Sequence, residues 1–337
     1  MNMFYTVNDA FVPQLGSAIC SVCENNRDAD RIVFYIGDLH ISAGHREQLT
    51  ALIGDYGREI VFLPINNLRE RLGFDFDTSG WNEVVLARLL TDRLLPEETE
   101  RVIYLDGDTI VCGSLKELWE TDLQGKTIGA VEEPTANHRR KKALGLEGKP
   151  YYNAGVMLID LKRWKERKIA ERVLAFYKAN EGRLFANDQD AINGAVPEEI
   201  LPLSPKFNYY NIFWHYKWES LVRISRPAPY LPRETLEQAG RDPRIIHYLG
   251  EERPWRRGNR HRYREDYRKY LEMTPWKDAP EETGWETYFR FYDAFWTILK
   301  PFPMLQYRII DALIPFVLNR RKAALKKRKQ AEKGTGV

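Results

Sequence analysis

The chain has 337 residues, of which 43% are hydrophobic and 29% are charged, and its formal net charge is +3 at pH 7. This composition is typical of a globular protein near the size at which one core stops growing, and no segment reaches the ~18 apolar residues of a membrane span. The three cysteines are too few for a disulfide framework, and we interpret Cys20 and Cys23, one helical turn apart, as buried side chains rather than a redox or zinc pair.

The first hundred residues alternate between short apolar runs and longer amphipathic stretches. The apolar runs predict strands at 3–7, 31–36, 59–65 and 101–105. The amphipathic stretches predict helices at roughly 13–25, 42–56 and 81–95, with Ser42 as the N-cap of the second. Strands that alternate with helices favour a parallel, doubly wound α/β sheet, and such sheets bind ligands beyond the carboxyl ends of their strands.

Beyond residue 150 the chain continues with further elements of both kinds. Residues 150–180 predict a strand and then a long helix with Asp160 as its N-cap, and 187–196 predict a short helix whose acidic first turn suits the helix dipole. Residues 200–230 are aromatic and proline-rich and predict loop rather than regular structure, whereas 244–250 predict a strand that leads into a turn. The composition changes near residue 275, where we place the boundary between a catalytic domain, 1–275, and a C-terminal extension, 276–337.

Two aspartates, Asp106 and Asp108, follow the predicted strand at 101–105 in "RVIYLDGDTIV". They could simply cap a turn, but like charges this close call for a cation or a trapped proton, and so two chemistries compete. In one, the carboxylates hold a divalent cation that also binds a nucleotide diphosphate. In the other, Asp106 is a nucleophile and Asp108 a general acid, as in the haloacid-dehalogenase-type phosphatases, whose D-x-D-x-[TV] motif the segment fits.

The position of the motif in the chain favours the cation. The phosphatase motif normally follows the first strand of its domain, whereas three predicted strands precede it here. The cation hypothesis needs a further ligand, and His247 in "HYLGEERPW" offers one. Two carboxylates and an imidazole suit Mn²⁺, with diphosphate oxygens in the other positions.

Six motifs occur in this order along the chain: "FYTVNDAF", "ARLL", "YLDGDTIV", "YYNAGVMLIDLKRW", "NDQDAING" and "HYLGEERPW". Over about 3–275 they resemble the motifs of the family 8 retaining glycosyltransferases, which include bacterial lipopolysaccharide galactosyl- and glucosyltransferases and glycogenin. It implies an α/β fold of the GT-A type, a single Rossmann-like domain with a mostly parallel mixed sheet, here followed by a helical, aromatic and basic extension. It also implies UDP-glucose or UDP-galactose as donor, Mn²⁺ or Mg²⁺ as cofactor, and retention at the anomeric carbon.

The resemblance further implies roles for individual residues. Asp106, Asp108 and His247 would ligate the metal. The residues that would contact the UDP-sugar are Thr6, Val7, Asn8, Asp9, Arg88, Asp106, Gly107, Asp108, Asn153, Ala154, Asp188, Gln189, His247, Gly250 and Arg253. Of these, Asn153, Asp188 and Gln189 would surround the transferred sugar as catalytic residues. Asn8, near the uracil, and Arg253, at the diphosphate, stand where relatives commonly carry an acid and a lysine, so these contacts are expected to differ.

The expected mechanism follows from charge. Breaking the sugar–diphosphate bond leaves positive charge on the sugar and negative charge on UDP, which the metal and Arg253 would stabilise. A double displacement needs a nucleophile beneath the sugar, and Gln189, at the matching position, carries a poorly nucleophilic amide. We therefore expect attack on the departing face, with a donor phosphate oxygen helping to deprotonate the acceptor, and Asp188 is the alternative nucleophile.

Positive charge gathers in two segments near the C-terminus. Residues 253–264 hold six arginines and no acid, which predicts either a solvated basic face or a contact with phosphates, and no recognition module for nucleic acid accompanies them. Residues 319–337 hold eight Lys or Arg and one Glu, and subtracting this +7 from the total of +3 leaves −4 for the rest of the chain. Aromatic residues from 286 and an apolar stretch at 309–318 precede this basic run. The combination favours an interfacial anchor on anionic lipid over a helical hairpin packed on the body.

We therefore predict a cytoplasmic enzyme, peripheral at the inner face of the membrane, that transfers glucose or galactose from UDP to a cell-surface glycan or glycolipid such as the lipopolysaccharide core. The first residues lack a basic region followed by an apolar one, so no secretory signal is expected. The phosphatase and a non-catalytic scaffold that binds sugar nucleotides or membrane are the alternative hypotheses. The sequence does not distinguish glucose from galactose, and it fixes neither the acceptor nor the oligomeric state.

Overall fold

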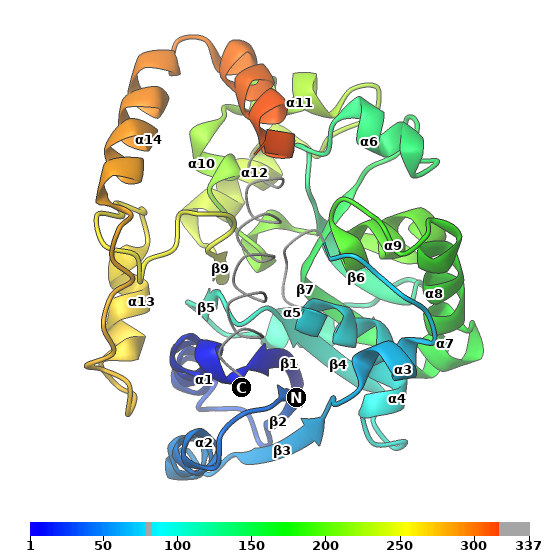
Figure 1. Ribbon diagram of the computed structural model, residues 1–337, viewed down its shortest axis with the longest axis vertical. Coiled ribbons are helices and arrows are strands. Elements are labelled where there is room, and N and C mark those ends of the chain that lie inside the picture. Colours follow the sequence, from blue (N-terminus) through cyan, green and yellow to red (C-terminus); the bar gives the residue numbers. More distant parts are fainter. Residues whose placement is uncertain (79–82, 317–337) are drawn as a thin grey trace, which may run out of the picture.

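The computed structural model describes residues 1–78 and 83–316. Within them a seven-stranded sheet of order β3-β2-β1-β4-β7-β6-β8 forms the centre of the molecule (Figure 1). Its strands are β1 (Asn2–Asn8), β2 (Val33–Leu39), β3 (Glu59–Pro64), β4 (Arg101–Leu105), β6 (Ile128–Glu132), β7 (Tyr152–Asp160) and β8 (Ile200–Leu203). The pairs β3–β2, β2–β1, β1–β4 and β6–β8 are parallel, whereas β7 is antiparallel to both β4 and β6. The predicted mixed, mostly parallel sheet is confirmed.

A second, antiparallel sheet and the helices complete the fold. The small sheet pairs β5 (Thr109–Val111) with β9 (Ile245–His247). Up to residue 299 the α-helices of the described residues are α1 (Val12–Asn25), α2 (Ala43–Asp55), α3 (Leu68–Leu72), α4 (Thr91–Leu94), α5 (Lys116–Glu120), α6 (His138–Ala143), α7 (Leu161–Glu166), α8 (Ile169–Ala179), α9 (Asn187–Ala195), α10 (Ile212–His215), α11 (Trp218–Ser225), α12 (Arg233–Arg241), α13 (Arg264–Leu271) and α14 (Glu286–Leu299). The 3₁₀ helices are η1 (Asp9–Phe11), η2 (Glu83–Leu90), η3 (Pro197–Glu199) and η4 (Pro205–Phe207). Residues 303–316 are also helical.

Several predicted elements are confirmed and others need correction. The helices predicted at 13–25 and 42–56 are α1 and α2, and the Ser42 hydroxyl caps α2 by accepting a hydrogen bond from the His45 amide. The helix predicted at 81–95 is instead the 3₁₀ helix η2 followed by the short α4, and its first residues lie outside the described ones. The segment 200–230, which was predicted as loop, contains the strand β8 and the helices α10 and α11. The strand β8 forms despite its proline because it pairs with β6.

The long helix predicted after Asp160 is divided in two. Asp160 caps α7 as predicted, accepting a hydrogen bond from the Arg163 amide at 2.9 Å. Lys168 then takes a left-handed backbone with φ of +53°, which ends α7 and begins α8. Because the apolar pattern is nearly continuous across this break, periodicity alone did not indicate it.

Alternate side chains of the central strands enter two hydrophobic layers. Tyr5 and Ile103 face the layer that includes side chains of α1, α2 and α13, and Phe4 and Tyr104 face the layer that includes side chains of α7, α8 and α9. Cys20 and Cys23 are buried in the first layer, as predicted, and burial raises the pKa of Cys23 to about 12. Their thiols are therefore packing groups at neutral pH.

The C-terminal extension packs on the body through one face, with α14 along one side of the molecule in Figure 1. The Trp296 ring of α14 stacks on His215 with centroids 3.7 Å apart, and Phe289 is buried. In the segment 303–316, Asp311 accepts a hydrogen bond from the Asn137 amide at 2.6 Å. One face of the extension thus packs on the body, and the predicted basic run at 319–337 lies outside the described residues, so the predicted interfacial anchor stays a prediction. None of the described helices is both long and apolar enough to cross a membrane.

Candidate active site

The sheet topology gathers the predicted site residues at one edge. Because β1 and β4 are parallel neighbours, their carboxyl ends place Asn8 and Asp106 on the same side. The strand β7 runs antiparallel to β4, so its first residues, including Asn153, return to that edge. The strand β6 runs antiparallel to β7, and its last residue, Glu132, also ends there. The site therefore lies at the carboxyl edge of the parallel strands, as the sequence predicted.

The three predicted metal ligands meet at this edge. The strands β5 and β9 pair so that His247 lies opposite Thr109, next to Asp108. The Nε2 atom of His247 is 3.3 Å from Oδ1 of Asp108 and 3.9 Å from Oδ2 of Asp106. One ligand atom from each of the three side chains lies within 4.8 Å of the others. We call Asp106, Asp108 and His247 the metal trio.

The hydrogen bonds around His247 test whether the trio suits a cation. The Asn208 amide donates to Oδ1 of Asn153 at 2.9 Å, so its own Oδ1 is left to accept from Nδ1–H of His247, also at 2.9 Å. In the neutral imidazole, the lone pair of Nε2 then faces two carboxylates, an arrangement that needs a cation or a proton between them. Burial alone would lower the pKa of His247, but the Asp108 carboxylate raises it above its ordinary value. The residues fit a divalent cation of the Mn²⁺ or Mg²⁺ type.

Arg88 joins this trio to the region predicted for the sugar. Its buried guanidinium lies 2.7 Å from Oδ1 of Asp106 and 3.0 Å from Oδ2 of Asp188, and it donates to the Ala154 carbonyl at 2.7 Å. Burial opposes its charge, yet the two carboxylates raise the pKa of Arg88 above its ordinary value. Arg88 is therefore a buried group that holds the Asp106 and Asp188 carboxylates in place. Its predicted contact with the UDP-sugar stays a prediction.

The residues predicted around the transferred sugar form one hydrogen-bonded group. The Gln189 side chain accepts from the Ala154 amide and donates to Glu133, each at 3.0 Å. The Asn153 amide donates to the same Glu133 oxygen at 2.9 Å. Burial raises the pKa of Asp188 to about 6, although Arg88 opposes this rise. The Gln189 amide is a poor nucleophile, and Asp188, although mostly ionised at neutral pH, is held by its ion pair with Arg88.

Three residues of this group were not predicted. Glu133 follows β6, a strand that the sequence pattern did not indicate, and Asn208 lies in a segment predicted as loop. Gly155 was within a quoted motif but was given no role. A Cβ atom on Gly155 would lie 2.3 Å from Cε1 of His247 and 2.8 Å from Oδ2 of Asp106, so only glycine leaves room for the trio.

The other residues that were predicted to contact the UDP-sugar lie around the ends of β1 and β4. The Thr6 hydroxyl is 3.1 Å from that of Tyr104, which donates to Asp106 at 2.8 Å. A Cβ atom on Gly107 would lie 3.3 Å from Cγ1 of Val7, so these two predicted residues are also close together. Asp9 accepts a hydrogen bond from the Ser42 amide at 2.8 Å and so supports the start of α2.

The loop after β9 brings Arg253 to the trio. Its Nη2 atom is 3.5 Å from Oδ2 of Asp108. Gly250 has a φ of +80°, a left-handed conformation that glycine adopts without strain. The two residues predicted to contact the diphosphate are therefore on the loop that follows His247, and Arg253 faces the trio.

Several arginines of 253–264, for which a solvated basic face or a contact with phosphates was predicted, instead pair with acids of the protein. Arg256 pairs with Glu251 and with Glu282, and Arg264 pairs with Glu281. Since residues 281 and 282 are remote in sequence, only the fold reveals these pairs. The ion pairs of Arg256 and Arg264 with Glu282 and Glu281 therefore link the basic stretch to the extension.

Comparison with known proteins agrees with this geometry. The chain matches the sequence model of glycosyl transferase family 8 over residues 2–259. General stress protein A of Bacillus subtilis (strain 168) is 26% identical over 280 residues, which are 82% of this chain and 94% of that protein. Lipopolysaccharide 1,2-glucosyltransferase of Escherichia coli (strain K12) is 25% identical over 82% of this chain and 79% of its own length. The crystal structure of galactosyltransferase LgtC in complex with donor and acceptor sugar analogs matches with a TM-score of 0.69 and 25% identity, covering 82% of this chain and 96% of that one. These similarities give no support to the phosphatase hypothesis.

Proposed function

The chain belongs to glycosyltransferase family 8, and from this membership we propose that it transfers glucose or galactose from a UDP-sugar to a glycan or glycolipid acceptor, with retention and with Mn²⁺ as cofactor. The observation that carries the proposal is the metal trio, whose imidazole is oriented by Asn208 so that Nε2 faces both carboxylates. Two carboxylates and an imidazole form a donor set that suits Mn²⁺. The similarity to lipopolysaccharide 1,2-glucosyltransferase supports a cell-surface glycan such as the lipopolysaccharide core as acceptor.

The residues of the site suggest how the reaction would proceed. A bound cation would act as a Lewis acid on the diphosphate leaving group. Arg253, beside Asp108, would add positive charge where negative charge develops on UDP. The ion pair with Arg88 holds Asp188 in place, and Gln189 is an amide fixed by Ala154 and Glu133. Neither is free to attack the sugar from below, which supports attack of the acceptor on the departing face.

Release of UDP from a panel of UDP-sugars tests the proposal. We expect slow release from UDP-glucose or UDP-galactose in Mn²⁺ without acceptor, loss of release in excess EDTA, and recovery when Mn²⁺ is restored. UDP-N-acetylglucosamine and UDP-glucuronic acid are the comparison donors. Hydrolysis of a phosphomonoester without release of UDP would contradict the proposal and favour the phosphatase.

We also propose that the extension binds the cytoplasmic face of a membrane with the face that does not pack on the body. On α14 the side chains of Phe291 and Ile298, seven residues apart and therefore on one face, are 73% and 70% exposed. Phe302 is 60% exposed, and Leu305 and Leu313 are about half exposed. A basic run follows at 319–337 in the sequence, which suits anionic headgroups beside this apolar surface.

Sedimentation with phosphatidylglycerol vesicles tests the membrane proposal. The variant Phe291→Ser, Ile298→Ser, Phe302→Ser should bind at least about tenfold more weakly than the wild type, since each buried apolar side chain contributes about 1.5–3 kcal/mol. The matched control is Val61→Ser, Met273→Ser, which removes exposed apolar side chains outside the extension helices and should bind as the wild type does. Equal sedimentation of all three proteins would refute the role of this face.

A further inference from the structure

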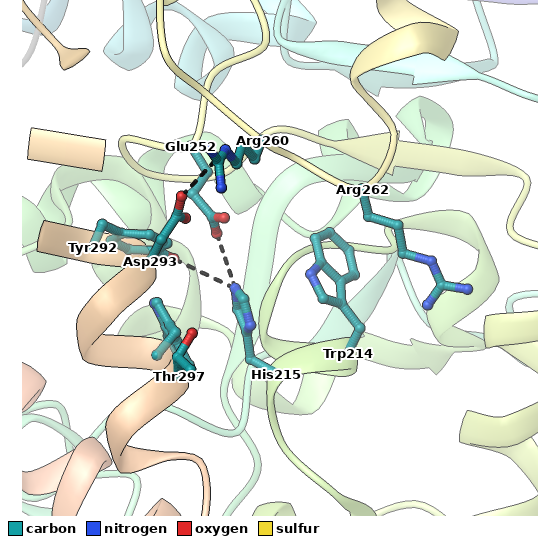
Figure 2. A pocket seen from close by; sticks show the side chains of 9 residues that line it. Trp214, His215, Glu252, Arg260, Arg262, Tyr292, Asp293 and Thr297 are labelled. Atoms are coloured by element: carbon teal, nitrogen blue, oxygen red, sulfur yellow. Dashed lines mark hydrogen bonds and ion pairs between the residues drawn. The ribbon is translucent and has the colours of Figure 1, made fainter. Parts of the chain in front are cut away.

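A cavity of about 310 Å³ lies between α14 and the body, apart from the metal trio (Figure 2). One wall is α14, with Tyr292, Asp293 and Thr297. The opposite wall comes from Trp214 and His215 at the end of α10 and from the loop after β9. This volume is at the lower end of the range for small-molecule sites. The cavity therefore has room for a ligand of the size of one sugar ring.

The charged groups that line the cavity balance one another. Glu252 and Asp293 supply two carboxylates, and Arg260 and Arg262 supply two guanidinium groups. Asp293 lies 3.7 Å from Arg260, and Glu252 lies 3.2 Å from Nε2 of His215. An anionic ligand would meet the two carboxylates, and a cationic ligand would meet the two guanidinium groups. The lining thus favours a neutral ligand with both donors and acceptors.

The chemical groups of the lining suit a carbohydrate. Sugar hydroxyls donate to carboxylates and accept from guanidinium groups, and the C–H face of a pyranose ring is apolar and packs on aromatic rings. The rings of Trp214, Tyr292 and Trp296 line the same cavity as the charged groups. Arg262 is exposed and makes no ion pair with any described carboxylate, and in Figure 2 no dashed line joins it to another residue. Its donors are available to a ligand.

The position of the cavity connects it to the reaction. Glu252, which lines it, is the neighbour in sequence of Arg253, which faces Asp108 of the metal trio. One loop thus reaches the proposed donor site and the cavity. The match to the family model ends at residue 259, so Arg260, Arg262 and all of α14 lie beyond the matched residues. The cavity is therefore built jointly by the family domain and the part of the chain that follows it.

The geometry points to a distal acceptor subsite, in which this cavity binds a neutral hexopyranose unit of the acceptor glycan at some remove from the unit that is glycosylated. This inference rests on the proposed function and adds a role for the extension. The catalytic domain holds the donor, and the extension selects the acceptor by its sugar composition.

The test uses the full-length protein and the double variant Arg262→Gln, Asp293→Asn. Both side chains are at least partly exposed and contribute little to folding, so the variant should fold. The matched control is Arg290→Gln, an exposed arginine of α14 that does not line the cavity. The probes are methyl β-glucoside, methyl β-galactoside and inorganic phosphate, and ligand-observed NMR measures their affinity.

We expect at least one glycoside to bind the wild type and the Arg290→Gln control equally, and to bind the double variant about tenfold more weakly, as the loss of hydrogen bonds to charged groups implies. Release of UDP from the donor should be the same in all three proteins. Equal glycoside binding by the double variant would overturn the inference. Binding of phosphate alone, or of no probe, would overturn it too. A wild type that releases no UDP refutes the proposed function instead, and the NMR result still decides whether the cavity binds sugar.

Discussion

Replacing Gly155 by alanine is expected to lower the proposed Mn²⁺-dependent release of UDP about 100-fold, a cost that a misplacement of about 1 Å can have. The new Cβ atom would lie 2.3 Å from the His247 ring and 2.8 Å from Asp106. Neither group can yield freely, because Asn208 holds the ring and Arg88 holds the carboxylate. The measurements are the rate of UDP release and the Mn²⁺ concentration that gives half of the maximal thermal stabilisation.

Gly129 of β6 provides the matched control. It is a buried strand glycine, and a Cβ atom there would meet flexible leucine ends, Leu123 at 3.0 Å and Leu203 at 3.1 Å. Gly129→Ala should therefore cost some stability through overpacking but keep the wild-type dependence on Mn²⁺. If Gly155→Ala kept its Mn²⁺ dependence within a factor of two, the glycine would not be required for the trio.

Arg88→Met is expected to lower the free energy of unfolding by about 3–5 kcal/mol, the cost of removing one partner from a buried ion pair. Arg88 and Asp188 are both buried, and Arg88 also bonds Asp106 and the Ala154 carbonyl. Without the guanidinium, Asp188 is a buried carboxylate with no compensating charge. Urea denaturation in EDTA measures the loss, and adding Asp188→Asn to Arg88→Met should recover part of it.

The dependence on pH separates this explanation from a simple packing defect. Burial already raises the pKa of Asp188 to about 6, above its unfolded value, and loss of Arg88 should raise it further. The folded state then binds more protons than the unfolded state, so stability should increase as the pH is lowered through this range. The loss in Arg88→Met should accordingly be smaller at pH 5.5 than at pH 8. Arg31→Met removes an exposed pair with Glu59 and should change stability little at either pH, and an equal loss in Arg88→Met at both would contradict the ion-pair explanation.

The sequence pattern was sufficient to locate the elements that have clear apolar runs or clear end signals. The apolar runs of β1, β3 and β4 and the amphipathic face of α1 were found near their observed bounds, and the Ser42 N-cap marked the start of α2. The three-residue β5 and the glycine-containing β6 carry too little periodicity to be seen, and tertiary pairing creates them. The predicted long helix after Asp160 failed at Lys168, where a backbone conformation, not a change in composition, ends α7.

The residues of the candidate site also fall into two groups: some were predicted from the sequence, and others were revealed only by the structure. Asp106, Asp108 and His247 were predicted because their motifs occur in an order that resembles a known family, and the pairing of β5 with β9 brings them together. Glu133 and Asn208 were not predicted, since an isolated acid or amide carries no local signal. Their roles arise only when the chain places them against Gln189 and His247.

The sequence by itself determined the α/β class and the family and predicted that Asp106, Asp108 and His247 form one group, because residue types and their order along the chain are enough for those inferences. Only the tertiary structure decided what each charged group faces. It showed that Arg256 and Arg264 pair with acids of the extension, that Arg88 is buried between two carboxylates, and that α14 and the body together line a cavity. The physical reason is that electrostatic and steric interactions depend on distance in space, and spacing in sequence does not fix that distance for residues far apart in the chain.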